Sequence, residues 1–154
     1  MQGSVSSSTP RSPLHTRVTV VGSRKLEAVP HLLADLVHRI EDPMVLLRHP
    51  LYGEANKFEQ IAAAMMVNLQ VPFGWERPEP GGRASVFNRD ITMVGKSDLV
   101  LAFFADDQMS GGTEHVVEKA MDQWIPVYSY GVRDDHYVLI GSFDPDDLFP
   151  EMTI

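Results

Sequence analysis

The chain has 154 residues, of which 44% are hydrophobic and 22% charged, the usual balance of a single globular domain. Its formal net charge of −8 is unsuited to following a nucleic-acid backbone, so we expect no nucleic-acid partner. The lack of cysteine excludes a disulfide framework and a thiolate metal site, and it fits a reducing compartment, so we expect a cytoplasmic protein. No apolar run approaches the roughly 20 residues of a membrane span, so we expect no membrane association.

The first half of the chain alternates between β-branched and amphipathic segments. Residues 1–16 are rich in Ser, Thr and Pro without a hydrophobic stretch, which predicts a disordered leader rather than a secretory signal. The β-branched run that ends at Gly22 then predicts a first strand, and Pro72 favours an edge position for the third strand. The elements predicted here are a strand over 17–21, a helix over 30–40, a strand over 44–47, a helix over about 55–69 and a strand over 71–75.

The second half continues this alternation after an irregular stretch. Residues 76–83 hold two prolines and two glycines, which predicts a mobile lid rather than regular structure. Residues 137–140 are a candidate sixth strand, and Asp144 with Pro145 predicts the start of a short terminal helix. The other elements predicted here are a helix over about 84–94, a strand over 99–104, a helix over about 112–124 and a strand over 126–130.

Five strands that alternate with four helices predict an α/β fold of three layers. We expect a Rossmann-like, mainly parallel sheet of five strands in the order 3-2-1-4-5, with helices on both faces. In this interpretation residues 17–130 form the domain, and residues 131–154 are a C-terminal extension packed on it.

The predicted topology places a ligand site between two loops. In an open parallel sheet, ligands bind beyond the carboxyl ends of the strands, where the strand order reverses. The first and fourth strands flank that point, and their exit loops are residues 22–25 and 105–113. Arg24 and Lys25 supply charge there, and Arg89 lies one helix upstream. The same loops supply hydroxyl groups and backbone N–H groups that suit an anion, at Gly22, Ser23, Ser110, Gly111, Gly112 and Thr113.

Each of these features also has a plain structural interpretation. A glycine pair is equally typical of an ordinary helix start, and Arg89 is equally typical of a surface ion pair. Asp106 and Asp107 suit a solvated turn better than a metal site, and no two histidines have a zinc-binding spacing, so we expect no metal and no cofactor. The glycine pattern of dinucleotide-binding folds, the P-loop and the Gly-x-Ser-x-Gly elbow are all lacking.

The order and spacing of several short motifs resemble a known family. Over about residues 18–130, the chain resembles the SLOG superfamily of Rossmann-like domains, nearest to its YspA-like branch. The motifs are 18–24 (VTVVGSR), 53–59 (GEANKFE) with 61–62 (IA), 81–84 (GGRA), 88–90 (NRD) with Met93, 98–103 (DLVLAF), and 110–113 (SGGT) with Ala120 and 126–127 (PV).

The resemblance implies binding of a nucleotide or nucleotide-derived ligand, and assembly as a homo-oligomer. The implied phosphate-binding pocket uses the first turn, here Gly22, Ser23 and Arg24, and the turn over 110–113. The family's pair ahead of the fourth strand stands here as Asn88-Arg89, in reversed order, so either side chain can be the one that faces the ligand.

A weaker similarity to nucleoside 2-deoxyribosyltransferases lies in the Gly-Thr turn. In those enzymes a nucleophilic glutamate follows the threonine by three residues, and that position is Val116 here. The chain also lacks the Pro-Gly-Gly-x-Gly-Thr motif and following glutamate of the SLOG phosphoribohydrolases. We therefore predict a nucleotide-binding sensor or sequestering module. The alternatives are an N-glycosidic bond hydrolase or transferase for nucleosides or their monophosphates, with Glu114, Asp90 or Asp106 as its carboxylate, and a domain that works only by assembly.

Overall fold

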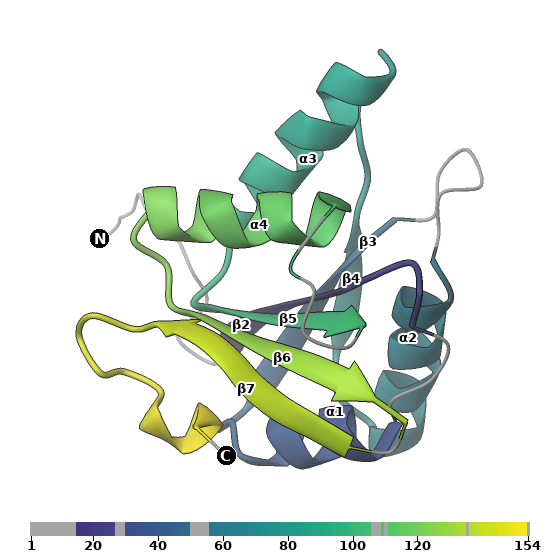
Figure 1. Cartoon of the computed structure of the whole chain (residues 1–154). Coiled ribbons are helices and arrows are strands. Elements are labelled where there is room, and N and C mark those ends of the chain that lie inside the picture. The colour runs from purple at the N-terminus through teal and green to yellow at the C-terminus, as the bar shows by residue number, and fades with distance from the viewer. Residues whose placement is uncertain are drawn as a thin grey trace, which may run out of the picture.

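The protein is described by a computed structural model over residues 15–26, 30–49, 56–105, 109, 111–134 and 136–153. Within this part of the chain, one sheet runs through the middle of the molecule in the order β4-β3-β2-β5-β6-β7 (Figure 1). Its strands are β2 (Thr16–Gly22), β3 (Pro43–Arg48), β4 (Phe73–Glu76), β5 (Leu99–Ala105), β6 (Val127–Arg133) and β7 (His136–Phe143).

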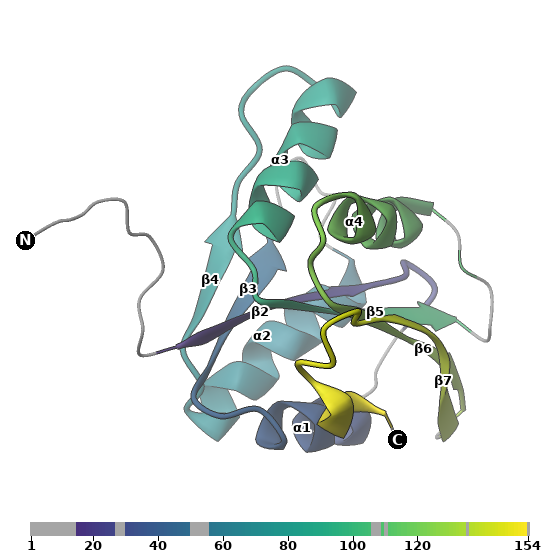
Figure 2. The same cartoon turned by 90° about the vertical axis from the view of Figure 1, so that its left-hand side faces the viewer.

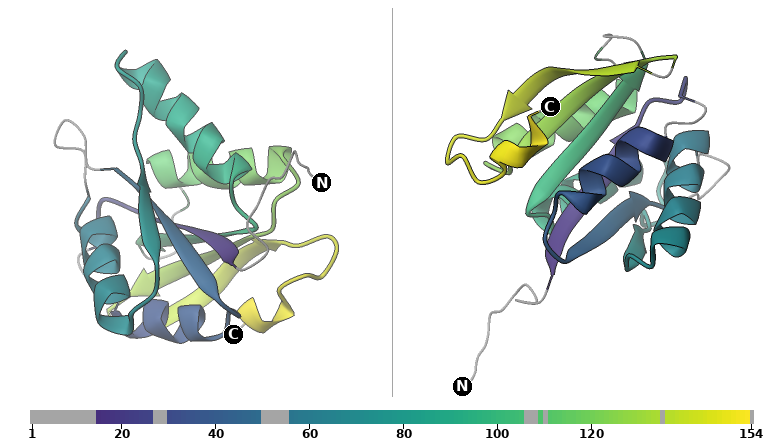
Figure 3. Two further views of the ribbon diagram at one scale, coloured as in Figure 1. Left: turned by 180° about the vertical axis from the view of Figure 1, so that it is seen from behind. Right: turned by 90° about the horizontal axis from the view of Figure 1, so that it is seen from below.

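The sheet has six strands in the described residues, so the expectation of five was wrong. The first five strands are parallel and follow the predicted order, whereas β7 pairs antiparallel with β6. The residues expected to be a C-terminal extension therefore continue the sheet. β7 alternates between exposed and partly covered residues instead of forming a continuous apolar run, as is usual for a strand at an edge. Figure 3 shows β4 at the opposite edge, as Pro72 favours.

Helices cover both faces of the sheet, as predicted. α1 (Pro30–His38) and α2 (Lys57–Leu69) lie on one face, and α3 (Arg83–Gly95) and α4 (Gly111–Asp122) lie on the other (Figure 2). Each face has its own buried core. Leu33, Leu36, Phe58 and Met66 from the first pair pack with Phe103, and Met93, Val116 and Ala120 from the second pair pack with Phe104.

The chain ends differently from the prediction. Asp144 was expected to cap a terminal helix, but the only regular element beyond it in the described residues is the short 3₁₀ helix η1 (Pro150–Met152). The Asp144 carboxylate accepts hydrogen bonds from the backbone N–H groups of Leu148 and Phe149, and from the Tyr128 hydroxyl at 2.8 Å. These three hydrogen bonds close a turn and occupy both carboxylate oxygens of Asp144, which are then not free to cap an α-helix. No described helix combines the length and apolar character needed to cross a bilayer.

Candidate functional site

A cavity of about 800 Å³ lies beyond the carboxyl ends of the central strands. Five elements each place a terminal residue on its wall: Gly22 ends β2, Arg48 ends β3, Asn56 caps α2, Gly82 caps α3, and Gly111 begins α4. Figure 1 shows the N-terminal end of α3 projecting away from the sheet, on the side where Gly82 lines the cavity. In a parallel sheet every strand leads to its helix at the same edge, which is why these ends converge.

The cavity wall is rich in positive charge although the chain as a whole is acidic. Arg24, Lys25, Arg48 and Arg89 line it, and Asp90 is the carboxylate on the wall among the described residues. Arg24 and Lys25 are exposed at the rim, whereas Arg48 and Arg89 have side chains only 12% and 5% exposed. The wall therefore has an outer and a buried layer of cations, and the buried layer is poorly screened by water.

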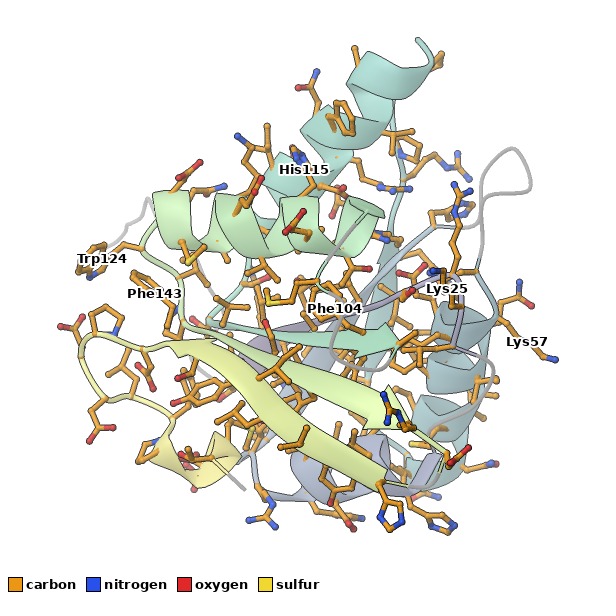
Figure 4. All side chains as sticks on the ribbon, viewed as in Figure 1. Lys25, Lys57, Phe104, His115, Trp124 and Phe143 are labelled. Carbon is orange, nitrogen blue, oxygen red and sulfur yellow. The ribbon has the colours of Figure 1, made fainter. Side chains whose placement is uncertain are left out.

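The Gly22–Lys25 turn is closed by its own hydrogen bonds. The Ser23 N–H donates to the Phe103 carbonyl of β5 at 2.9 Å, and the Leu26 N–H donates to the Ser23 carbonyl at 3.1 Å. The Ser23 hydroxyl oxygen accepts from the Lys25 N–H at 3.2 Å. This fixed turn places Lys25 beyond the end of β2 (Figure 4).

Gly22 is required for packing as well as for the turn. A Cβ atom at this position would lie 2.3 Å from the ring of Phe58 in α2, which is closer than side chains approach. Gly111 has a φ of +74°, a conformation that side chains rarely adopt, and it begins α4 at the cavity. Both glycines thus have a structural reason that is independent of any ligand.

Arg48 links three helices at the floor of the cavity. Its Nη1 lies 3.4 Å from Oε2 of Glu59 in α2, and its Nε lies 3.4 Å from Oδ1 of Asp90 in α3. Its Nη2 donates to the Gly112 carbonyl, at the start of α4, at 2.8 Å. The N–H groups in these two ion pairs are not aligned for hydrogen bonds, so Arg48 Nε and Glu59 Oε2 have no hydrogen-bond partner among the described residues.

Glu59 is a buried carboxyl group directly beneath this wall. Its side chain is 2% exposed, and this desolvation raises the pKa of Glu59 from 4.5 to about 7, because the interior disfavours the charged form. Arg48 and Arg89 oppose the rise in the Glu59 pKa, and Asp90 adds to it. A hydrogen bond with the Gly22 backbone also favours the ionised form.

Arg89 has unused hydrogen-bonding capacity on the cavity wall. Its Nη1 donates to the His49 carbonyl and its Nη2 lies near Oδ1 of Asp90, both at 3.4 Å. Its Nε–H is buried and has no hydrogen-bond partner in the described part of the chain. A buried donor without a partner costs free energy, so the Arg89 guanidinium, which belongs to the cavity wall, would gain from an added anionic acceptor.

The wall beside these cations is apolar. Val86 and Phe87 of α3 line the cavity, and the Phe87 side chain is left 42% exposed. The Phe87 ring lies 4.7 Å from the ring of His115 in α4, centroid to centroid, at an angle of 39°. Figure 4 shows His115 on the side of α4 that is next to α3. The cavity therefore offers a planar apolar group a surface within reach of positive charge.

The structure brings most of the predicted site residues together. Gly22, Ser23, Arg24, Arg89, Gly111, Gly112 and Thr113 line the cavity, as does the candidate catalytic residue Asp90. Asn88 is exposed on α3, and neither it nor Glu114 is among the described residues on the wall, so Arg89 is the member of its pair that faces the cavity. Ser110 and Asp106 lie outside the described residues.

The stretch expected to form a lid is shorter than predicted. Glu76 belongs to β4 and bonds Lys96 at 2.9 Å, and α3 already begins at Arg83. Gly82 is the residue of the intervening stretch that lines the cavity.

Arg48, Asn56 and Glu59 were not predicted as site residues. Arg48 follows a predicted strand, so the rule that sites lie at carboxyl ends of strands could have indicated it. Glu59 lies on the buried face of α2, three and four residues before the buried Ala62 and Ala63, and a charge on an apolar face is a signal in the sequence itself. The described residues contain no cluster of His, Asp and Glu that could hold a metal ion.

Comparison of the chain with family models, with curated proteins and with solved structures found no match.

Proposed function

We propose that this chain binds a nucleotide or a nucleotide-derived small molecule in the cavity, as a sensor or sequestering module. The observation that carries the proposal is Arg89, a lining residue of the cavity whose side chain is only 5% exposed and whose buried Nε–H has no partner in the described residues. The N-terminus of α4 and Arg48 add to the attraction for an anion on the same wall.

The shape and the apolar wall support a ligand with two chemically different ends. A volume of about 800 Å³ lies within the range of small-molecule sites. Phe87 and Val86 suit a flat heterocycle, and Arg48 and Arg89 suit phosphate oxygens, which arginine binds through paired N–H groups. A nucleotide carries both groups in one molecule.

Membership of the SLOG superfamily is part of the same proposal. It rests on the order of the sequence motifs and is compatible with a Rossmann-like sheet whose two glycine turns line one cavity. The resemblance also implies a homo-oligomer, and sedimentation of the purified chain would test this by measuring the mass of the assembly.

The alternative, an N-glycosidic bond hydrolase or transferase, is favoured by the position of Asp90. Its carboxylate lines the cavity and is 3% exposed, as a nucleophile in a closed site would be. However, Asp90 lies 3.4 Å from Arg48 and from Arg89, and two cations at that distance make a carboxylate a weaker nucleophile. We therefore prefer binding.

A thermal-shift screen of nucleosides, mononucleotides, dinucleotides, cyclic nucleotides and ADP-ribose derivatives tests the proposal. A ligand at 100 times its Kd should stabilise the folded chain by roughly 2.7 kcal/mol. Each hit is recovered and its products are analysed. An intact ligand supports binding, whereas free base would support the alternative. No shift with any member of the panel would overturn both proposals.

Arg89→Lys tests whether the buried guanidinium holds the ligand. The variant keeps the charge but loses the fork of N–H donors, so we expect the Kd of the best ligand to rise roughly tenfold to a hundredfold. Arg39→Lys makes the same change at an exposed residue after α1, on the other face of the sheet, and should leave the Kd unchanged. Equal affinity of both variants in calorimetry would remove Arg89 from the site.

A further inference from the structure

Four charged groups are buried below the cavity, and their net charge depends on whether one of the two carboxyl groups is protonated. Arg48 and Arg89 contribute two positive charges, and Asp90 and Glu59 contribute two carboxyl groups, each within 4 Å of a guanidinium nitrogen. With both carboxyl groups ionised the set is neutral. With one of them protonated the set carries a charge of about +1, and it then attracts an anion in the cavity more strongly.

Arg48 is the link between this set and the cavity. Its guanidinium lines the cavity and lies 3.4 Å from Glu59 Oε2. Because that contact is not a hydrogen bond, an anionic oxygen that approaches Arg48 competes with Glu59 for the same positive charge. Glu59, which is buried, cannot replace the lost attraction with water, and a proton is the remaining way to remove the cost of its charge.

We propose that an anionic ligand enters this cavity together with a proton, which Glu59 Oε2 takes from solvent as Arg48 turns its charge toward the ligand. This inference rests on the proposed function, since it needs an anion in the cavity. It assigns Glu59 as a positioning residue: Glu59 acts on the ligand through Arg48 and sets the pH range in which the anion binds.

The surroundings of Glu59 support this assignment. The charged groups that face it are Arg48 at the end of β3, and Arg89 and Asp90 on α3, and the Gly22 backbone of β2 bonds it. Its pKa of about 7 means that a modest change in nearby charge shifts the proton near neutral pH.

Two imidazoles also lie near the cavity. His49 lies beside Trp75, with ring centroids 6.1 Å apart, and His115 lies beside Phe87. A substitution at Glu59 leaves both imidazoles in place. It therefore separates a proton taken up by Glu59 from one taken up elsewhere in the protein.

The experiment counts protons by calorimetry at pH 8, with AMP and with ADP-ribose as separate probes. Titrations in two buffers of different ionisation enthalpy give the number of protons taken up for each ligand bound. At this pH the AMP phosphate is already dianionic and free Glu59 is mostly ionised. We expect the native chain to take up roughly half a proton or more. Glu59→Gln, which keeps the shape and carries no charge, should take up almost none and bind roughly tenfold more tightly.

Glu118→Gln is the matched control, because Glu118 is exposed on α4 and does not line the cavity. It should behave as the native chain does. Binding without proton uptake by the native chain, or equal uptake by Glu59→Gln, would overturn this inference and leave the proposed function intact. If neither probe binds any of the three proteins, the inference fails, and the wider thermal-shift panel decides whether the proposed function fails with it. Binding without proton uptake by the native chain overturns the inference by itself, so the inference can fail even where Glu59→Gln does not fold.

Discussion

Glu59 stands at a position where glutamate usually caps a helix, but its side chain has a different role in this fold. It occupies the N3 position of α2, where its N–H bonds the Asn56 side chain at 2.9 Å, and helix caps commonly have glutamate there. Yet its carboxyl group does not return to the cap. It lies buried between Arg48 and the Gly22 backbone, where it costs stability at high pH.

The pH dependence of folding should report this cost. The folded pKa of Glu59, about 7, exceeds the ordinary value of 4.5, so between these pH values the folded chain holds a proton that the unfolded chain releases. The Glu59 contribution to stability is therefore complete below about pH 4.5 and is lost as the pH rises through 7. Glu59→Gln has no such loss.

The difference in free energy of unfolding between Glu59→Gln and the native chain should shift in favour of Glu59→Gln by about 3 kcal/mol between acidic pH and pH 8, from a pKa that rises from 4.5 to about 7. Urea unfolding at a series of pH values measures the difference. Glu118→Gln, at an exposed position, should follow the native curve. A constant difference between Glu59→Gln and the native chain at all pH values would show that Glu59 keeps an ordinary pKa when folded.

At the scale of elements, the local sequence pattern was sufficient to predict a helix or strand wherever that element is amphipathic or fully buried. The run 99–104 predicted β5, and the apolar spacing over 55–69 predicted α2, each within two residues of its bounds. The strand order and the helices on both faces followed from the alternation of the two types. Residues 137–140 were a candidate strand but were not counted in the predicted sheet; they lie in β7, which pairs antiparallel with β6.

The parts of the site that escaped prediction depend on contacts between distant elements. The glycine turns are local, so they were found from sequence. Arg48 contacts Asp90 and Gly112 only after β3, α3 and α4 have packed together. No spacing in the sequence predicts these contacts. The pair Asn88-Arg89 was likewise resolved only by the orientation of α3, which exposes the first residue and buries the second.

Asn56 joins α2 to the central strand, and this joint can be tested. Its Oδ1 accepts from the Glu59 N–H at 2.9 Å, and its Nδ2 donates to the Gly22 carbonyl at 2.7 Å. Asn56→Ala removes a helix cap and leaves a buried carbonyl unpaired, so we expect a loss of about 2–3 kcal/mol in the free energy of unfolding.

Asn68→Ala is the control for Asn56→Ala, since Asn68 is exposed within the same helix. It should change stability by less than about 0.5 kcal/mol. Chemical unfolding of both variants measures the difference. Equal stability would mean that Asn56 contributes nothing as a cap or as a bridge to β2.

At the scale of the whole molecule, the charge of the cavity is opposite to that of the chain. The net charge of −8 repels an anionic ligand at a distance, whereas the cavity wall attracts it at short range. The two layers of cations should differ in their response to salt. Arg24 and Lys25 are exposed at the rim, so dissolved ions screen them, whereas Arg48 and Arg89 are buried and are screened much less.

This difference predicts how salt changes the affinity for ADP-ribose, whose charge is constant near neutral pH. Raising NaCl from about 0.05 to 0.5 M should weaken native binding several-fold. Replacing Arg24 and Lys25 by Gln should remove most of that salt dependence. Arg39→Gln with Lys57→Gln removes the same charge at exposed positions off the cavity wall, and Lys57 is visible on the outer side of α2 in Figure 4. This control should keep the native slope. Equal slopes for the two double variants would mean that the rim cations do not act on the ligand, and binding would then depend on the buried arginines and the α4 N-terminus.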